Sequence, residues 1–384
     1  MSLPAVYHRP DYARDMAQQL LQPSALQLQV RSGVFLSGIR RIGKTTFLRQ
    51  DLMPALEGMG ALVIYVDLWS DRSKNPASLV HEAVRATLTQ LATPGTRLLD
   101  RFKGLNMGAA GFSFGFQVDA VGKADGATLA QVFTELMDKV QTSVVLIVDE
   151  VQQALGTEEG SHLLFALKAA RDAVNTRPGT PGYLLFIGTG SHKSLVADMA
   201  TRRSQPFAGA VSTAYEPLGP DFVRWKLEQL QALPGIKLPS PAVVWEGFVT
   251  LGQRPEELQN ALVQLQARPE APDMAFPIIC ATLACAAAEV ELATIEAQGT
   301  LASAIFDRIA QGPEAGASGL FATEAISAYA QQTGVVVDTP QVQNMVERMI
   351  GANLIHRQSH GVYAVVDPFV RQVWRQRQAL RTPT

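Results

Sequence analysis

Residues 38–46 have the side chains of a phosphate-binding loop. They match the pattern G-x-x-x-x-G-K-[ST] and read, in order, Gly38, Ile39, Arg40, Arg41, Ile42, Gly43, Lys44, Thr45 and Thr46. The two glycines leave room for a phosphate group beside the backbone, and the successive N–H groups of such a loop point toward it. Lys44 adds a positive charge for the β- and γ-phosphates, and the Thr45 hydroxyl is suited to bind Mg²⁺. We therefore predict a nucleotide site at this loop.

Two carboxylates form a second candidate site. Asp149 and Glu150 directly follow residues 144–148, five consecutive aliphatic side chains typical of a parallel strand covered on both faces. Carboxylates at the C-terminal end of such a strand lie beside the crevice where α/β proteins bind ligands. We expect Asp149 to hold Mg²⁺ and Glu150 to polarise the attacking water of a hydrolysis reaction. The alternative is an acidic turn that only ends the strand.

Together these two motifs resemble those of the archaeal and bacterial ATPase group in the STAND branch of the AAA+-like P-loop ATPases. The paired arginines Arg40 and Arg41 inside the loop are typical of that group. Residues 353–357 and 361–369 also resemble its closing winged-helix segment. The resemblance implies an Mg²⁺-dependent nucleoside triphosphatase, with ATP rather than GTP as its nucleotide.

The resemblance also implies residues that sense the terminal phosphate. Thr189 and Ser191 follow a predicted strand and are the candidates, with a glycine-rich turn carrying incidental hydroxyls as the alternative. A sensing or trans-acting arginine is expected near Arg202 and Arg203, because arginine neutralises charge that develops on the transferred phosphoryl group. The family's leucine-tyrosine-glycine-arginine run is missing there, so a solvent-facing basic pair is the competing interpretation.

Arg254 and Pro255 begin a predicted helix in the region after the sheet. With Gly252 they resemble the glycine-x-x-proline element by which the lids of these ATPases approach the nucleotide. Pro255 has the fixed φ that suits the first turn of a helix, and Arg254 is a candidate for contact with the phosphates. A proline-initiated helix with an exposed arginine is the alternative.

The surrounding pattern predicts an α/β fold. Short apolar runs at residues 33–37, 61–66, 144–148, 183–187 and 211–215 read as strands, and helical spacing fills the intervals. Such alternation indicates a P-loop parallel sheet with helices on both faces. Residues 104–126 break the rhythm with several glycines and an alternating run at 112–116. That run suggests a hairpin or a mobile flap.

Beyond residue 217 the strand signals fade. Helical patterns at 222–230, 243–250, 255–266 and 276–295 predict a helical lid. Helices at 301–310, 322–332 and 339–351, followed by short apolar strands at 354–357 and 362–366, predict a winged helix. We therefore expect three domains, at 1–217, 218–298 and 299–384, with residues 311–319 as a flexible link.

Composition is typical of a soluble enzyme. The 384 residues are 47% hydrophobic, with a net charge of −2, so the whole chain is not a polycation that would seek nucleic acid. Residues 274–290 are the most apolar segment, but Pro277 and Glu289 interrupt them, and we expect a buried helix rather than a membrane span. The first residues lack a signal-peptide pattern, which favours a cytoplasmic location.

Three functions are compatible with these features. A nucleotide-driven switch is favoured, in which ATP binding and hydrolysis move the lid and the winged helix. An AAA+-type ATPase that binds duplex DNA through the winged helix is the alternative. From Ala302 onward, seven arginines and six carboxylates give a net charge of only +1, with residues 371–381 as the one basic concentration. The third is a scaffold that needs nucleotide only to fold, although Glu150 argues against it. A protein partner and a nucleotide-dependent homo-oligomer stay open.

Overall fold

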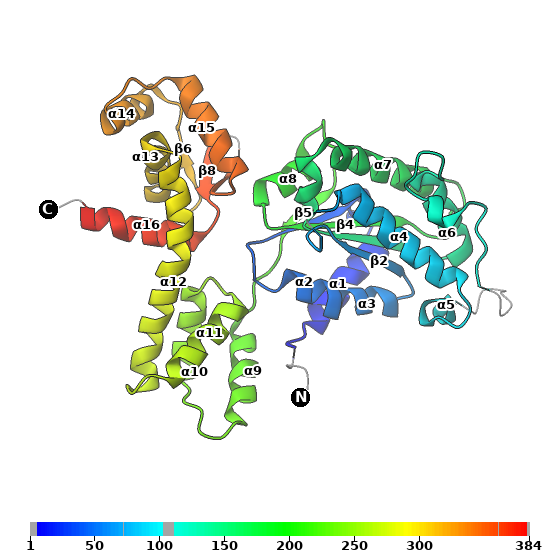
Figure 1. Cartoon of the computed structure of the whole chain (residues 1–384), viewed down its shortest axis with the longest axis horizontal. Coiled ribbons are helices and arrows are strands. Elements are labelled where there is room, and N and C mark those ends of the chain that lie inside the picture. Colours follow the sequence, from blue (N-terminus) through cyan, green and yellow to red (C-terminus); the bar gives the residue numbers. More distant parts are fainter. Residues whose placement is uncertain (1–5, 72, 103–110, 360, 382–384) are drawn as a thin grey trace. The chain divides into compact units, whose positions relative to one another are not determined.

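The computed structural model describes residues 6–71, 73–102, 111–359 and 361–381 (Figure 1). The chain divides into two compact units. The first comprises Met1–Gly38 and Lys44–Tyr215, and the second comprises Ile39–Gly43 and Glu216–Thr384. Each unit is described by itself.

The first unit is built on a five-stranded parallel sheet with the order β2-β3-β4-β1-β5. The strands are β1 (Val34–Ser37), β2 (Leu62–Asp67), β3 (Val144–Asp149), β4 (Leu184–Gly190) and β5 (Val211–Ala214). The predicted fold class is confirmed. Every residue of β3 is buried, because the sheet is covered on both faces.

Helices cover this sheet on its two faces (Figure 1). One group is α1 (Pro10–Leu21), α2 (Lys44–Phe47) and α3 (Met53–Gly58), and the other includes α4 (Pro76–Ala92), α6 (Leu129–Val140) and α7 (Glu158–Asn175). The unit also contains α5 (Arg97–Phe102) and α8 (Lys193–Thr201). The main core lies between the sheet and α4, α6 and α7, where Val144, Leu146 and Val148 of β3 point. Alternate residues of β3 therefore pack against these helices, and this packing holds the strand in place.

The second unit is mostly helical. Its first part contains α9 (Pro220–Gln231), α10 (Pro241–Thr250), α11 (Pro255–Gln266) and α12 (Pro272–Ala297). Its second part contains α13 (Thr300–Gln311), α14 (Thr323–Thr333), α15 (Thr339–Gly351) and α16 (Pro368–Arg381), with strands β6 (Ala317–Ser318), β7 (Ile355–Ser359) and β8 (Val362–Val365). The three strands form an antiparallel sheet in the order β6-β8-β7. Helices followed by this hairpin give the expected winged-helix arrangement.

Two local predictions need correction. The alternating run at 112–116 forms no strand, which excludes the hairpin but leaves the mobile flap untested, and Phe114 and Phe116 stack on each other. The rest of that segment, residues 103–110, lies outside the described residues. The predicted link at 311–319 contains β6, whose residues Ala317 and Ser318 pair with Tyr363 and Val362 of β8.

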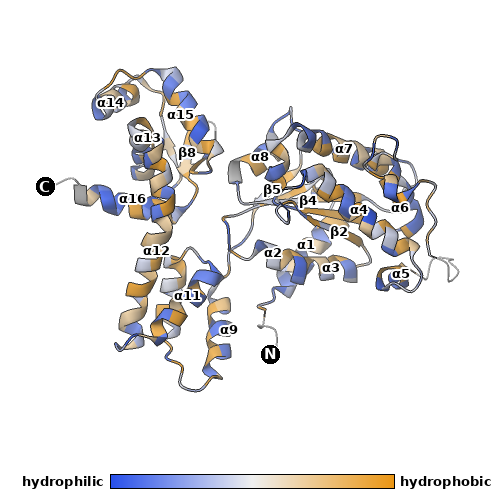
Figure 2. Cartoon of the chain, in the orientation of Figure 1, coloured by the Kyte–Doolittle hydropathy of each residue, from blue (hydrophilic) through white to orange (hydrophobic). Residues whose placement is uncertain are grey.

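The apolar segment at 274–290 belongs to α12, which is longer and less buried than expected. Among the described residues, α12 is long and apolar enough to span a membrane, with a mean hydropathy of 1.8 over a window of which 33% is buried. Met274, Ile278 and Val290 are exposed. Figure 2 shows the hydrophobic colouring along much of α12. Helices that pack inside soluble proteins can have the same composition.

Candidate nucleotide site

The phosphate-binding pattern lies between β1 and α2, as its chemistry requires. Lys44 is the first residue of α2 and is 7% exposed, and its Nζ donates a hydrogen bond to Gly38 O at 2.6 Å. Gly43 has a φ of +94°, and Arg41 has a φ of +67° although it is not a glycine. Loop residues in the left-handed region turn their N–H groups toward a common centre, and the start of a helix adds positive potential there.

Asp149 stands at the end of β3 with four hydrogen-bond donors around it. Thr45 Oγ1 donates to Asp149 Oδ2 at 2.6 Å, and Tyr65 Oη donates to the same oxygen at 3.1 Å. The other oxygen, Oδ1, accepts from Glu150 N at 3.1 Å and from Thr189 Oγ1. Asp149 is 1% exposed, so these donors replace the water that a carboxylate needs. The structure therefore brings the predicted residues Thr45, Asp149 and Thr189 together.

The oxygens of Thr45 and Asp149 fit a magnesium ion. Mg²⁺ prefers hard oxygen ligands and is held by one or two protein groups together with substrate phosphates and water. The described residues contain no cluster of three or more His, Cys, Asp or Glu side chains that could form a dedicated metal cage. A hydroxyl and a carboxylate beside a phosphate loop match a magnesium site of one or two protein groups completed by phosphates and water.

Glu150 lies just past β3 in a second hydrogen-bonded group. Its backbone is left-handed, with φ 56° and ψ 41°, and it precedes the 3₁₀ segment Val151–Gly156. Its Oε2 accepts a hydrogen bond from Ser191 Oγ at 3.1 Å and another from Gln152 Nε2. Two of the sequence candidates, Glu150 and Ser191, are therefore in direct contact.

The sequence did not point to Tyr65, Asp67 or Gln152 as neighbours of the site. Tyr65 lies near the end of β2 and Asp67 is the last residue of this strand, which pairs with β3 so that Asp67 lies beside Asp149. Burial, assisted by the charge of Asp149, raises the pKa of Tyr65 well above its ordinary value, so the phenol stays protonated and can donate. Burial also raises the pKa of Asp67, opposed by the Trp69 N–H and reinforced by Asp149. In the sequence, the position of Asp67 at the end of a predicted strand was the one feature that could have indicated its place beside the site.

Two of the predicted arginines, Arg202 and Arg254, are paired with carboxylates. Arg202 pairs with Asp198 one helical turn earlier, at 2.8 Å, and both it and Arg203 are exposed after α8. Arg254 precedes α11, where Pro255 is the first residue as predicted, and its side chain is ion-paired with Asp367. The described contacts of Arg202 and Arg254 are thus to carboxylates of the protein itself.

The basic segment at 371–381 is also engaged within its own unit. Arg371 Nε and Arg375 Nε donate to Ala310 O at 2.8 and 2.6 Å, and Arg375 Nη2 donates to Gly312 O at 2.8 Å. Arg377 is ion-paired with Glu289. Guanidinium groups at the C-terminal end of α13 donate hydrogen bonds to its last carbonyl groups. Their positive charge also interacts favourably with the negative end of the helix dipole. At least these three arginines of the segment therefore make contacts within their own unit.

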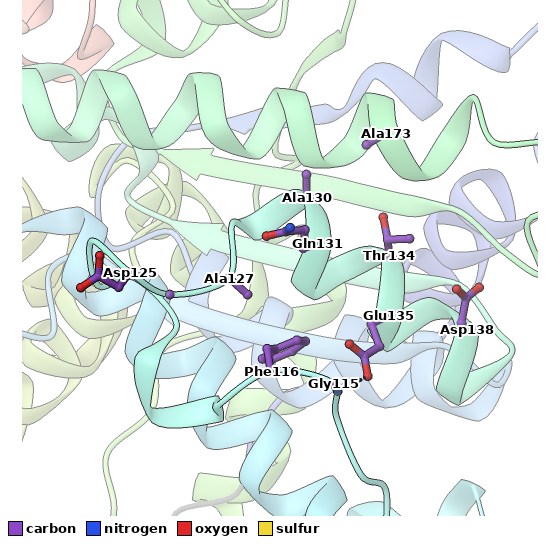
Figure 3. A pocket seen from close by; sticks show the side chains of 11 residues that line it. Gly115, Phe116, Asp125, Ala127, Ala130, Gln131, Thr134, Glu135, Asp138 and Ala173 are labelled. Carbon is purple, nitrogen blue, oxygen red and sulfur yellow. Dashed lines mark hydrogen bonds between the residues drawn. The ribbon is translucent and has the colours of Figure 1, made fainter.

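A cavity of about 770 Å³ lies in the first unit, beside α6 and α7. Figure 3 shows Phe116 next to Glu135 of α6, with Asp138 farther along the same helix. Glu135 Oε1 accepts a hydrogen bond from Gly115 N at 2.6 Å, and Asp138 is paired with Arg177 at 2.8 Å. None of the lining residues belongs to the phosphate loop or to the Asp149–Glu150 pair.

Two solved structures resemble the whole chain. The ADP form of the ORC2 protein from Aeropyrum pernix has a TM-score of 0.56 and 13% sequence identity, covering 100% of this chain and 97% of that one. The ADPNP–ADP complexes of the same protein give a TM-score of 0.50 and 15% identity, covering 98% and 96%. The chain therefore shares the overall fold of that protein. No family model matches it, and no curated protein sequence does either.

Proposed function

We propose that this protein is an Mg²⁺-dependent ATPase that works as a molecular switch. The observation that carries the proposal is the contact between Thr45 Oγ1 and Asp149 Oδ2, at 2.6 Å. It places a phosphate loop, a buried carboxylate and Glu150 at one edge of the sheet. Solved structures of the similarly folded ORC2 protein contain ADP and ADPNP, which supports an adenine nucleotide as the ligand.

Each side chain has a separate task in this proposal. The backbone of the loop and Lys44 bind the β- and γ-phosphates, while Thr45 and Asp149 supply oxygens for Mg²⁺. When bound, the metal ion neutralises charge on the phosphates and aligns them. Thr189 holds the Asp149 carboxylate in place through its hydrogen bond. Glu150 orients a water molecule and accepts its proton as the γ-phosphate is attacked.

The finer assignments rest on sequence patterns. The arginine pair in the phosphate loop supports membership of the STAND group, and the helices and hairpin of residues 300–381 support a winged helix that reports the nucleotide state. We keep a cytoplasmic location and a nucleotide-dependent homo-oligomer as predictions. Arg202, Arg203 and Arg254 also stay candidates for contact with nucleotide. Described contacts support Arg254, because it directly precedes α11, whose Glu257 lies 3.3 Å from Arg41 of the phosphate loop.

Duplex DNA is the second candidate ligand, because of the exposed face of α15. Gln343, Asn344 and Arg348 are exposed there, and amide and guanidinium groups are the side chains that read base edges in the major groove. Replacing Asn344 and Arg348 with alanine should then abolish duplex binding, measured by fluorescence anisotropy at several salt concentrations. The absence of salt-sensitive binding by the parent would remove this candidate.

The proposal is tested by titrating the protein with ATP and Mg²⁺ in a calorimeter. Lys44→Ala should weaken ATP binding by at least about tenfold, because it removes a charge-assisted contact with the phosphates. Lys123→Ala is the matched control, since Lys123 is exposed and distant in sequence from the loop. Equal ATP affinity in the parent and in Lys44→Ala would refute the assignment of the loop.

A further inference from the structure

Gln152 connects the carboxylate of Glu150 to the end of β4. It lies in the 3₁₀ segment Val151–Gly156 and is 7% exposed. Its Nε2 donates to Glu150 Oε2 and lies 3.3 Å from Ser191 Oγ. Ser191 Oγ donates to the same Glu150 oxygen at 3.1 Å. Three side chains therefore form a closed hydrogen-bonded group around one oxygen of the Glu150 carboxylate.

The amide of Gln152 can face Glu150 in one orientation only. Its Nε2 is a donor, whereas the reversed amide would place Oε1 against an ionised oxygen. In the present orientation, Gln152 Oε1 is buried and has no hydrogen-bond partner among the described residues. A buried unsatisfied oxygen is unfavourable, so packing alone would favour an apolar side chain at this position. The hydrogen bonds of Nε2 are the feature that requires glutamine.

Gly190 provides the space that the Gln152 side chain occupies. A Cβ atom on Gly190 would lie 2.1 Å from Gln152 Oε1 and 2.6 Å from Val196 Cγ2. Any other residue at position 190 would displace the amide or the backbone of β4. The backbone of Glu150 is itself in the left-handed region, with a φ of 56°. The glutamate is thus fixed at its backbone by the turn and at its carboxylate by Gln152 and Ser191.

We propose that Gln152 is a positioning residue for Glu150 in ATP hydrolysis, an inference that rests on the proposed function. In that step the water oxygen forms a bond to the γ-phosphorus, and its proton passes to the Glu150 carboxylate. The bond between the γ-phosphorus and the β,γ-bridging oxygen breaks, and ADP leaves with the electron pair. Donors on Glu150 Oε2 hold the carboxylate so that Oε1 is left to accept from the water.

The test compares Gln152→Leu, which keeps the approximate size of the side chain and removes its donor, with the parent protein. We expect kcat for ATP to fall by about 10- to 100-fold, as for a misplaced reacting group, while KM changes by less than about threefold. Gln153→Leu is the matched control, because Gln153 is the neighbouring glutamine and no hydrogen bond of its side chain is described. It should retain the parental kcat.

Gln152→Glu adds a second measurement, the pH dependence of turnover, which a purely structural role of Gln152 would not change. At about pH 8 the new carboxylate repels Glu150 and turnover should be low, whereas toward about pH 5.5 a protonated carboxyl donates as the amide does. The ratio of the variant's turnover to that of the parent should therefore rise as the pH falls. This measurement holds even if Gln152→Leu does not fold.

The outcomes are distinct. A kcat for Gln152→Leu that is within twofold of the parental value, or above it, would overturn the inference, as would an equal loss in Gln153→Leu. A parent protein that binds ATP without hydrolysing it would instead overturn the proposed ATPase activity, before any variant is compared.

Discussion

Thr45 Oγ1 and Asp149 Oδ2 lie 2.6 Å apart, although their residues are separated by 104 positions in the sequence. Asp149 ends β3, and Thr45 follows β1 in the chain. These two strands are not neighbours, because β4 lies between them in the sheet. Thr189, near the end of β4, bonds to the same carboxylate from this intermediate position. The strand order therefore creates the contact, and the helix that begins at Lys44 brings the Thr45 hydroxyl to it.

Thr189→Val should destabilise the first unit. Valine keeps the shape of threonine but removes a donor from Asp149, which is 1% exposed. Loss of a hydrogen bond to a buried charge should lower the free energy of unfolding by about 1–3 kcal/mol, measured by urea denaturation. Thr213→Val, at an exposed position on β5, is the control and should change it by less than about 0.5 kcal/mol. Equal effects of the two substitutions would show that the Thr189 hydrogen bond contributes nothing.

Asp67→Asn should change how stability depends on pH. Burial raises the pKa of Asp67, so its contribution to stability is present at low pH and is lost as the pH rises through the raised value. Asparagine does not ionise and can still accept from Trp69 N, which bonds to Asp67 Oδ1 at 2.7 Å. Between about pH 4 and neutrality, the variant should gain stability relative to the parent. Parallel curves of urea midpoint against pH for the two proteins would contradict this.

Asp367→Asn should strongly destabilise the second unit. The side chains of Arg254 and Asp367 are 14% and 7% exposed and form an ion pair. Removing one partner of a buried ion pair costs about 3–5 kcal/mol, and the nearby Glu291 carboxylate offsets part of this loss for Arg254. The exposed pair Arg224–Asp221, at 67% and 74%, offers a control in Asp221→Asn, expected within about 1 kcal/mol of the parent. Comparable small losses in both variants would mean that the Arg254–Asp367 pair is solvated in solution.

Arg375→Ala should lower stability without revealing a nucleic-acid contact. The guanidinium group of Arg375 bonds to carbonyls of residues 310–312 at the end of α13. We expect a loss of about 1–3 kcal/mol in thermal or urea unfolding, because the three hydrogen bonds of Arg375 are lost and Arg371 remains the guanidinium donor to Ala310 O and Gly312 O. Any duplex binding by the parent should be unchanged in the folded variant. A large loss of DNA affinity with unaltered stability would restore the basic segment as a DNA surface.

Much of the architecture could be predicted because long periodic segments dominate it. Residues 129–140 carry strong helical spacing, and α6 has these bounds, with Thr128 and Gln131 forming a capping box at its start. The strands of the first unit are short aliphatic runs between such helices, which is the pattern of a parallel sheet. The two-residue strand β6 was missed because so short an element has no period; it exists through its pairing with β8.

The contacts of the site could be predicted only in part. Local motifs identified Lys44, Thr45, Asp149 and Glu150, since each stands next to a strand or helix end. The approach of Gln152 to Ser191 depends on how the 3₁₀ segment Val151–Gly156 packs against β4, and the two residues are 39 positions apart. The ion pair of Arg254 spans 113 positions and has no local signature. Register and packing decide such contacts, and neither is written in a short sequence pattern.

The most direct test of the account is steady-state ATP hydrolysis by the parent and by Glu150→Gln, with ATP binding measured for both. Glutamine keeps the shape of the side chain but cannot accept the proton of the attacking water. We predict that Glu150→Gln binds ATP with parental affinity and that its turnover falls by about 10²-fold or more, as for loss of a general base. Equal turnover in the two proteins, or no hydrolysis by the parent in the presence of Mg²⁺, would contradict the proposed ATPase.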